Sequence, residues 1–150
     1  MGAAINLINS FKVKTVIFNC GRYNYLEREL IKVLKKKRIP YYSCIDELNL
    51  SQYNLQFLNT KEYDNENDNS NVIYLNYDNY KFLFMGDAGI NREKDILEKY
   101  NLSNIDFLKV GHHGSNTSSS EDFINIINPK YSIISVGENN RYNHPKDSVL

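Results

Sequence analysis

The sequence predicts an α/β domain in which helices pack on a sheet. Between residues 13 and 45 a strand pattern, a helical pattern and a second strand pattern follow one another, which is the order of a βαβ unit. Two further strand patterns, 72–77 and 80–86, are separated by Asp78-Asn79, residues that favour a tight turn and therefore predict a hairpin. Beyond the hairpin, helical and strand patterns alternate, which favours the same class.

Length and composition are those of one ordinary globular domain. The chain has 150 residues, of which 41% are hydrophobic and 24% charged. Its 18 basic and 18 acidic residues balance, so it has no global field that would attract nucleic acid or an anionic membrane. No apolar run reaches the ~18–20 residues of a membrane-spanning helix, and no secretory signal pattern is present. We therefore expect a soluble chain without direct membrane insertion, cytoplasmic as it stands.

The first part of the chain is expected to hold two helices and two strands. A short helix is predicted over 3–11, a strand covered on both faces over 13–19, a helix over 23–38 and a strand over 39–45. The basic run 35–38 fits the solvated carboxyl end of a helix better than a phosphate contact. Pro40 at the start of the second strand is tolerated there.

The middle of the chain has weaker patterns. Residues 46–60 predict a turn followed by a strand at about 53–58. The segment 61–71 is polar and acidic without an apolar anchor, so we expect a mobile loop.

After the hairpin the expected elements alternate. They are a helix over 90–101, a strand over 105–111, a helix over 118–129, a strand over 131–137 and the start of a helix at 145–150. The helix at 118 begins with serines followed by Glu121 and Asp122, a capping-box pattern, and Pro129 ends it.

The two cysteines do not have the spacing of a disulfide scaffold or of a zinc knuckle. Cys20 and Cys44 each lie in or beside an apolar run. We therefore expect buried free thiols.

Polar residues follow three of the predicted strands and predict a metal site. Asp87, the pair His112-His113 and His144 each lie in or beyond a glycine-containing turn. Loops that leave the carboxyl ends of strands gather at one edge of such a sheet. One carboxylate with up to three imidazoles suits Zn²⁺ or Mn²⁺. Taken singly, each motif is also typical of an ordinary turn, helix cap or loop.

Taken in order, the motifs resemble a known family. "LFMGDAG" followed by "DFLKVGHHGSNTSSSEDFINIINPKYSIISVGENNRYNHP" is similar to the carboxyl-terminal half of a metallo-β-lactamase-fold domain, in particular the hydrolase domain of the ComEC/Rec2 competence proteins. The resemblance runs from about Val72 to the last residue. It implies half of an αββα sandwich, with a mixed sheet and flanking helices.

The resemblance also implies roles for individual residues. Asp87 corresponds to a metal ligand that usually bridges two ions, and His113 is the second expected ligand, with His112 left to orient ligand or substrate. His112, Ser115 and His144 are the expected catalytic residues. Substrate phosphate would be bound at a serine-rich helix N-terminus and at the rim, by Ser115, Thr117, Ser118 and Asn140. The expected cofactor is Zn²⁺ or Mn²⁺, with two ions in the complete family.

The resemblance implies phosphodiester hydrolysis, with DNA as the expected substrate, but the family's HxHxDH motif has no counterpart in this chain. No histidine precedes His112, and the first residues resemble the segment that follows the motif. We therefore expect one truncated domain that is weakly active or inactive alone. The alternatives are a non-catalytic remnant or binding module that needs a separate N-terminal half, and a plain α/β domain without metal.

Partners and location follow from the resemblance as well. The expected partners are a phosphodiester substrate, an N-terminal half-domain and a membrane channel, and full-length relatives carry such a domain outside the cytoplasm. A sheet face without its partner layer would leave an exposed, aggregation-prone or dimerising surface.

Overall fold

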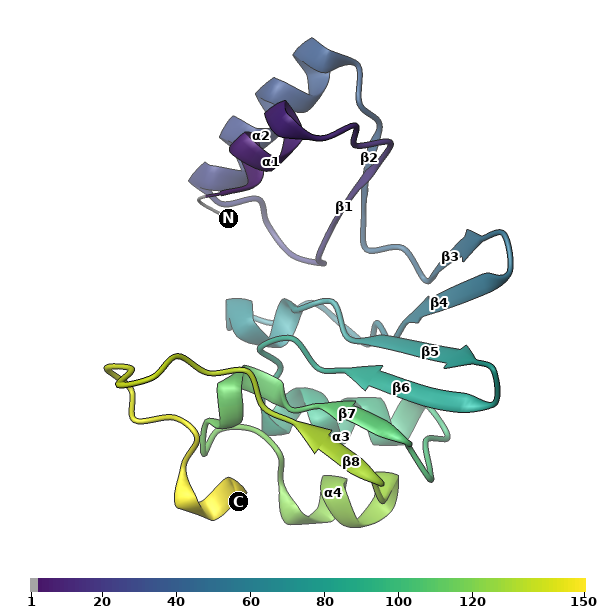
Figure 1. Cartoon of the computed structure of the whole chain (residues 1–150), viewed down its shortest axis with the longest axis vertical. Helices are drawn as coiled ribbons and strands as arrows, with labels where there is room; N and C mark the ends of the chain where they lie inside the picture. The colour runs from purple at the N-terminus through teal and green to yellow at the C-terminus, as the bar shows by residue number, and fades with distance from the viewer. Residues whose placement is uncertain (1–2) are drawn as a thin grey trace.

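The computed structural model describes residues 3–150 and shows two groups of elements, each with its own apolar core (Figure 1). The smaller, N-terminal group contains helix α1 (Ala4–Ser10), strand β1 (Val16–Phe18), helix α2 (Tyr25–Lys37) and strand β2 (Tyr41–Ser43). Strands β1 and β2 pair in parallel, so the predicted βαβ unit is confirmed. Strand β1 is shorter than expected and pairs only with β2, with Val16 and Ile17 half-buried, so the expectation of a strand covered on both faces is wrong.

Helix α2 is defined by its ends and by one apolar face. The Asn24 side chain accepts a hydrogen bond from the Glu27 amide at 3.0 Å, and the Glu27 carboxylate accepts one from the Asn24 amide at 2.8 Å, which is a capping box. The helix ends at Arg38 in the left-handed region, after a basic last turn that is exposed to solvent. Its apolar face packs against α1 and β1, in a core formed by Ile8, Phe18, Leu30, Ile31 and Leu34.

The larger group is a sheet of six strands with two helices. The strands lie in the order β3 (Glu47–Leu50), β4 (Tyr53–Phe57), β5 (Ile73–Tyr77), β6 (Tyr80–Phe84), β7 (Phe107–Lys109) and β8 (Tyr131–Ile133). The first four strands are antiparallel neighbours, whereas β6, β7 and β8 run parallel. The expected mixed sheet with flanking helices is therefore confirmed.

Helices α3 (Ile90–Lys99) and α4 (Glu121–Ile127) cover one face of this sheet. Leu83 and Leu108 from the strands pack with Ile96 of α3 and Phe123 of α4, and all four are almost inaccessible to solvent. This core holds the parallel strands in place, and therefore the loops that leave their carboxyl ends.

The opposite face of the sheet, called here the open face, is mostly apolar, and no helix of the part that the structure describes covers it (Figure 1). Side chains alternate between the two faces of a strand, and the register places the following residues on the open face: Leu48, Leu50, Tyr53, Leu55, Phe57, Ile73, Leu75, Tyr77, Tyr80, Phe82, Phe84, Phe107, Lys109, Tyr131 and Ile133. The rings of Phe82, Phe107 and Tyr131 stack on one another, with centroids 4.9 Å and 5.3 Å apart. Several of these side chains are exposed, among them Tyr131 and Ile133.

Two segments in the middle of the chain differ from the expectations. Residues 47–50, predicted as a turn, form the edge strand β3, because they pair with β4 across the turn at Ser51. Residues 61–71, predicted as a mobile loop, include a 3-10 helix (Glu66–Asn69) in which Asp68 and Asn69 are buried. The anchors are polar: Asp68 accepts a hydrogen bond from the Gly89 amide at 2.8 Å, and Asn69 bonds both backbone groups of Tyr63.

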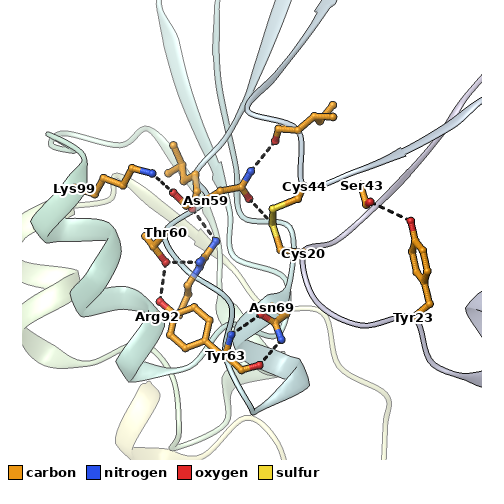
Figure 2. Close-up of a disulfide and its surroundings, with 12 residues drawn as sticks. Cys20, Tyr23, Ser43, Cys44, Asn59, Thr60, Tyr63, Asn69, Arg92 and Lys99 are labelled. Carbon is orange, nitrogen blue, oxygen red and sulfur yellow. Dashed lines mark hydrogen bonds between the residues drawn. A yellow bond between two sulfur atoms is a disulfide. The ribbon is translucent and has the colours of Figure 1, made fainter.

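The expectation of free thiols is also wrong, because Cys20 and Cys44 form a disulfide (Figure 2). The two residues are 24 positions apart in the sequence, but Cys44 follows β2 directly and Cys20 lies two residues beyond the end of β1, its parallel partner. Parallel pairing brings the two strand ends together and leaves their Cα atoms 4.5 Å apart. Sequence spacing does not reveal this, since the pairing is a tertiary contact.

Candidate functional site

The candidate residues lie on loops that leave the carboxyl ends of the three parallel strands. Asp87 follows β6, the His112-His113 turn follows β7, and His144 lies in the loop after β8. The first two loops are joined directly, because the His112 amide donates a hydrogen bond to the Gly86 carbonyl at 2.9 Å. Gly86 has φ +58°, and a Cβ there would lie 2.9 Å from the Cβ of Ser70, so the turn before Asp87 needs glycine.

Asp87 and His113 face each other across these loops. Nε2 of His113 lies 3.7 Å from Oδ1 of Asp87, and both side chains are about half exposed. Nδ1 of His113 donates a hydrogen bond to the Ser135 carbonyl at 2.7 Å, so this nitrogen carries the proton. Nε2, the other ring nitrogen, faces Asp87. A histidine that is fixed by a backbone carbonyl on one nitrogen and free on the other is typical of metal ligands.

The histidine turn is held in an unfavourable backbone conformation. His112 and His113 have φ values of +43° and +57°, in the left-handed region, where a residue with a side chain costs on the order of 1–3 kcal/mol. Ser118 stabilises the turn, because its hydroxyl lies within hydrogen-bonding distance of the Gly111 and Ser115 carbonyls, at 3.0 Å each. Unfavourable backbone conformations of this kind are common at functional sites.

His112 and His144 form a second pair beside the first. Their ring centroids are 6.0 Å apart, and Nδ1 of His112 lies 3.3 Å from the Thr117 hydroxyl. Nδ1 of His144 is buried and has no hydrogen-bond partner among the described residues. Burial lowers the pKa of His144, and Lys146, His112 and His113 lower it further. The His144 ring is therefore biased towards its neutral form.

The other predicted substrate residues mostly make internal contacts. Asn140 bonds the His144 amide at 3.0 Å and its carbonyl at 2.8 Å, so this side chain shapes the loop. Ser115 and Ser118 are buried. Thr117 is exposed on the same side as His112. The roles proposed for these residues in substrate binding remain predictions.

The serine-rich turn that leads into α4 is hydrogen-bonded to a carboxylate from another helix. Glu93 of α3, almost fully buried, accepts hydrogen bonds from the Ser119 amide and, at 2.9 Å each, from the Ser120 amide and hydroxyl. The expected serine N-cap of α4 is confirmed, because the Ser120 hydroxyl accepts a hydrogen bond from the Phe123 amide at 3.4 Å. The acidic half of the expected capping box is absent, since the third helical residue is Phe123. The Glu93 carboxylate thus takes up the Ser119 and Ser120 amides, and phosphate binding by the serine-rich turn stays a prediction. Sequence reasoning missed Glu93, which reads as one more polar residue of a helix.

Two clefts flank Asp87. One, of about 480 Å³, is lined by Asp87, His112 and Thr117 together with asparagines of the 65–67 segment and of α3. The other, of about 440 Å³, lies between the two groups of elements, with Phe18 and Asn24 on one wall and Asp87 and Asn67 on the other. A substrate that reaches Asp87 can therefore enter from two sides.

The metal-donor set is incomplete within residues 3–150. No group of three or more His, Cys, Asp or Glu side chains in this part of the chain is placed so that it could hold a metal ion. Asp87 and His113 are two donors, whereas a catalytic zinc ion ordinarily has three protein ligands and an open position. The described residues alone do not fit a catalytic metal ion.

Sequence comparison agrees with this fold. The family model for the metallo-beta-lactamase superfamily matches residues 2–138, so the chain belongs to that superfamily.

Among its relatives, ComE operon protein 3 of Bacillus subtilis (strain 168) is 32% identical over 157 residues, which cover 100% of this chain and 20% of the relative. Competence protein ComA of Neisseria gonorrhoeae is 39% identical over 98 residues, 63% of this chain and 14% of the relative. Recombination protein 2 of Haemophilus influenzae (strain ATCC 51907 / DSM 11121 / KW20 / Rd) is 38% identical over 85 residues, 57% and 10% respectively.

The chain thus spans about a fifth of the length of the first relative. The resemblance to the ComEC/Rec2 type of metallo-β-lactamase domain is confirmed. Among the described helices, none has the length and apolar character that crossing a membrane requires.

Proposed function

We propose that this chain supplies the carboxyl-terminal part of a metal-dependent phosphodiesterase domain and has little or no activity on its own. The observation that carries the proposal is the Asp87–His113 pair, held 3.7 Å apart at the carboxyl ends of two parallel strands, without a third donor beside it in residues 3–150. Zn²⁺ or Mn²⁺ is the expected ion, because the donors are one carboxylate and one imidazole.

The residues around the pair can assist a phosphodiester without forming the metal site themselves. His113 is oriented by the Ser135 carbonyl, so its free nitrogen is presented at a fixed position. His112 and Thr117 line the cleft beside Asp87 and carry hydrogen-bonding groups that can contact phosphoryl oxygens. His144, behind them, would polarise or position His112 as part of this group.

The missing ligands would come from a partner layer on the open face. This face is apolar over an area on the order of 400 Å², taking strand spacing and rise per residue into account, which is large for a surface left in water. It ends at the same strand ends that carry Asp87 and His113, so a sheet packed on it would place its own strand ends next to the pair. The partner we propose is a separate N-terminal half-domain with further histidine and aspartate ligands.

The open face fits a protein layer better than nucleic acid. Phe82, Phe107 and Tyr131 stack on one another, with interplanar angles of 11° and 21°, so most of their ring faces are not free to stack on bases. The chain has no net positive charge to attract a phosphate backbone.

DNA is the proposed substrate, and a compartment outside the cytoplasm is the proposed location, attached to a membrane channel. The names of the relatives, which refer to competence and to recombination, support the substrate. The Cys20–Cys44 disulfide supports the location, since structural disulfides persist mainly in oxidising compartments.

The alternative is a non-catalytic binding module that uses the same open face. The observation that favours it is the incomplete donor set. In that case the complex with a partner half-domain would form without binding a metal.

The test is to measure bound metal and the hydrolysis of bis-p-nitrophenyl phosphate for the chain alone and for the chain mixed with the N-terminal part of the metallo-β-lactamase domain of a competence relative. We expect substoichiometric Zn²⁺ and negligible turnover alone, and gain of both in the mixture. Asp87→Ala and His113→Ala should abolish the gain, whereas Glu98→Ala, at an exposed carboxylate of α3 remote from the pair, should not. Full turnover by the chain alone, or a gain unaffected by Asp87→Ala, would refute the proposal; complex formation without metal would favour the binding module.

A further inference from the structure

The Cys20–Cys44 disulfide lies at the joint between the two groups of elements. Oδ1 of Asn59 is 3.5 Å from Sγ of Cys20, and Nδ2 of Asn59 donates a hydrogen bond to the Ile45 carbonyl, next to Cys44, at 2.7 Å (Figure 2). The Asn59 carbonyl in turn accepts hydrogen bonds from Lys99 at 2.7 Å and from Tyr100 at 2.6 Å. Because a disulfide sulfur has no hydrogen to donate, the approach to Cys20 is a van der Waals contact. Asn59 is hydrogen-bonded to the backbone beside Cys44, which it links to the end of α3.

The turn that follows Cys20 makes further contacts across the joint. Gly21 has φ +110°, and a Cβ there would lie 3.0 Å from Nδ2 of Asn69. Nδ2 of Asn24 donates a hydrogen bond to Glu66 at 3.0 Å. These contacts close a cleft of about 470 Å³, lined on one side by residues 19–22 and on the other by residues of the 62–69 segment.

The joint is otherwise thin. The apolar cores of the two groups share no residue. The contacts across the joint include the Asn59–Ile45 and Asn24–Glu66 hydrogen bonds, each with a net stabilisation on the order of 1 kcal/mol, and the exposed Arg22–Glu62 ion pair at 4.0 Å. The covalent bond between the ends of β1 and β2 is therefore the strongest constraint on the shape of the turn that contacts the larger group. This turn also leads to the wall of the second cleft, where Asn24 faces Asp87.

We propose that the Cys20–Cys44 disulfide is a redox-controlled latch: when oxidised it holds the N-terminal group against the six-stranded sheet, and when reduced it releases this group and widens the cleft beside Asp87. The partner that it implies is a dithiol reductant, such as a thiol–disulfide oxidoreductase with two cysteines. The latch does not depend on the proposed hydrolase function, because it concerns only the joint.

The chemistry balances with this reductant. Cys44 is exposed, whereas Cys20 is only 8% exposed, so a thiolate of the reductant attacks Sγ of Cys44. The Cys20–Cys44 bond breaks, and Cys20 leaves as a thiolate and takes up a proton. The second thiolate of the reductant then attacks its own partner sulfur in the mixed disulfide and releases Cys44 as a thiol. The reductant becomes a disulfide, and two electrons pass to this chain.

The test is hydrogen exchange, followed by mass spectrometry, on the full chain in its oxidised and phosphine-reduced forms, after thiol titration of each. We expect no free thiol before reduction and two after it. Exchange should rise at least tenfold in peptides covering 13–45 and 59–70, with peptides of β5, β6 and β7 unchanged. The Cys20→Ser, Cys44→Ser double variant should show the reduced pattern without reductant.

A matched variant separates the latch from general loss of stability. Asn59→Ala leaves the disulfide intact but removes its noncovalent link to α3, so exchange should rise in 59–70 and less in 13–45. Free thiols in the oxidised protein would overturn the proposal. A change in exchange of less than twofold everywhere on reduction would also overturn it, because the disulfide would then not control the joint. So would an equal rise throughout the chain, because the disulfide would then stabilise the whole fold.

Discussion

Glu93 offers the sharpest test of how the site is held. Its carboxylate accepts three hydrogen bonds from Ser119 and Ser120 and so fastens the serine-rich turn, and through it the histidine turn, to α3. Glu93→Ala would leave two part-buried amide donors without partners, at about 1–2 kcal/mol each, the lower part of the range for such donors, whereas the Ser120 hydroxyl can turn to water. We expect the free energy of unfolding to fall by ~2–4 kcal/mol, which lowers Tm by ~6–12 °C for a chain of this length.

Glu93→Gln separates charge from shape. Glutamine keeps one acceptor oxygen but places an NH₂ group against the remaining amide donor, so the expected loss is smaller, on the order of 1–2 kcal/mol. Burial raises the pKa of Glu93, with Asp68 adding to the effect, although the three hydrogen bonds oppose it. An acid whose pKa is raised in the folded state adds stability below its unfolded pKa and loses that contribution as pH rises through the folded value.

The free energy of unfolding of the wild type should therefore exceed that of Glu93→Gln by less as pH is raised from about 4 towards 7. This range begins at the ordinary pKa of a glutamate. Urea denaturation at several pH values measures it, with Glu98→Gln on the exposed side of α3 as the matched control. Glu93→Ala as stable as the wild type would refute the role of this contact. An advantage that grows with pH would refute the assigned direction of the pKa shift.

Three further predictions concern other parts of the molecule. Reducing the Cys20–Cys44 disulfide, which closes a sequence separation of 24, should lower the free energy of unfolding of the N-terminal group by up to about 3.5 kcal/mol, measured by urea denaturation; a loss below ~1 kcal/mol would contradict the loop-closure estimate. Ile133→Lys, on the exposed part of the open face, should reduce self-association in analytical ultracentrifugation, and unchanged association would show that this face is not the contact. Lys61 and Tyr63 hydrogen bonds lower the pKa of Asp95, so Asp95→Asn should cost at most ~1 kcal/mol near neutral pH, with the difference lost as pH falls below the ordinary aspartate range; a difference that persists in acid would contradict this.

Local signals located most of the elements. Periodicity placed α2 and α3, and the Asp78-Asn79 turn placed the hairpin of β5 and β6, because these features depend on neighbouring residues. Strand β3 was missed although Glu47–Leu50 alternates polar and apolar residues, because a pattern of four residues is short and its pairing with β4 is a tertiary contact. The 61–71 segment was misread because its anchors, Asp68 and Asn69, are polar, and sequence patterns reveal burial only through apolar residues.

In the candidate site, too, sequence patterns located some features and tertiary contacts revealed the others. Glycine-flanked polar residues after strands pointed to Asp87 and His113, and the parallel order of the strands explains why these two meet. The orientation of His113 by the Ser135 carbonyl had no sequence signal, because the two residues lie 22 positions apart. The same holds for Glu93, which reaches the serine-rich turn from another helix.

By itself, the sequence determined the order of most helices and strands and the family, since both are written in short stretches of neighbouring residues; Asp87 and His113 as metal ligands stay a prediction. Only the tertiary structure decided that the cysteines pair, that Glu93 holds the serine-rich turn, and that one sheet face remains open. The physical reason is that these features arise where strands and helices distant in sequence come into contact, and a linear pattern carries no information about which of its polar groups will meet.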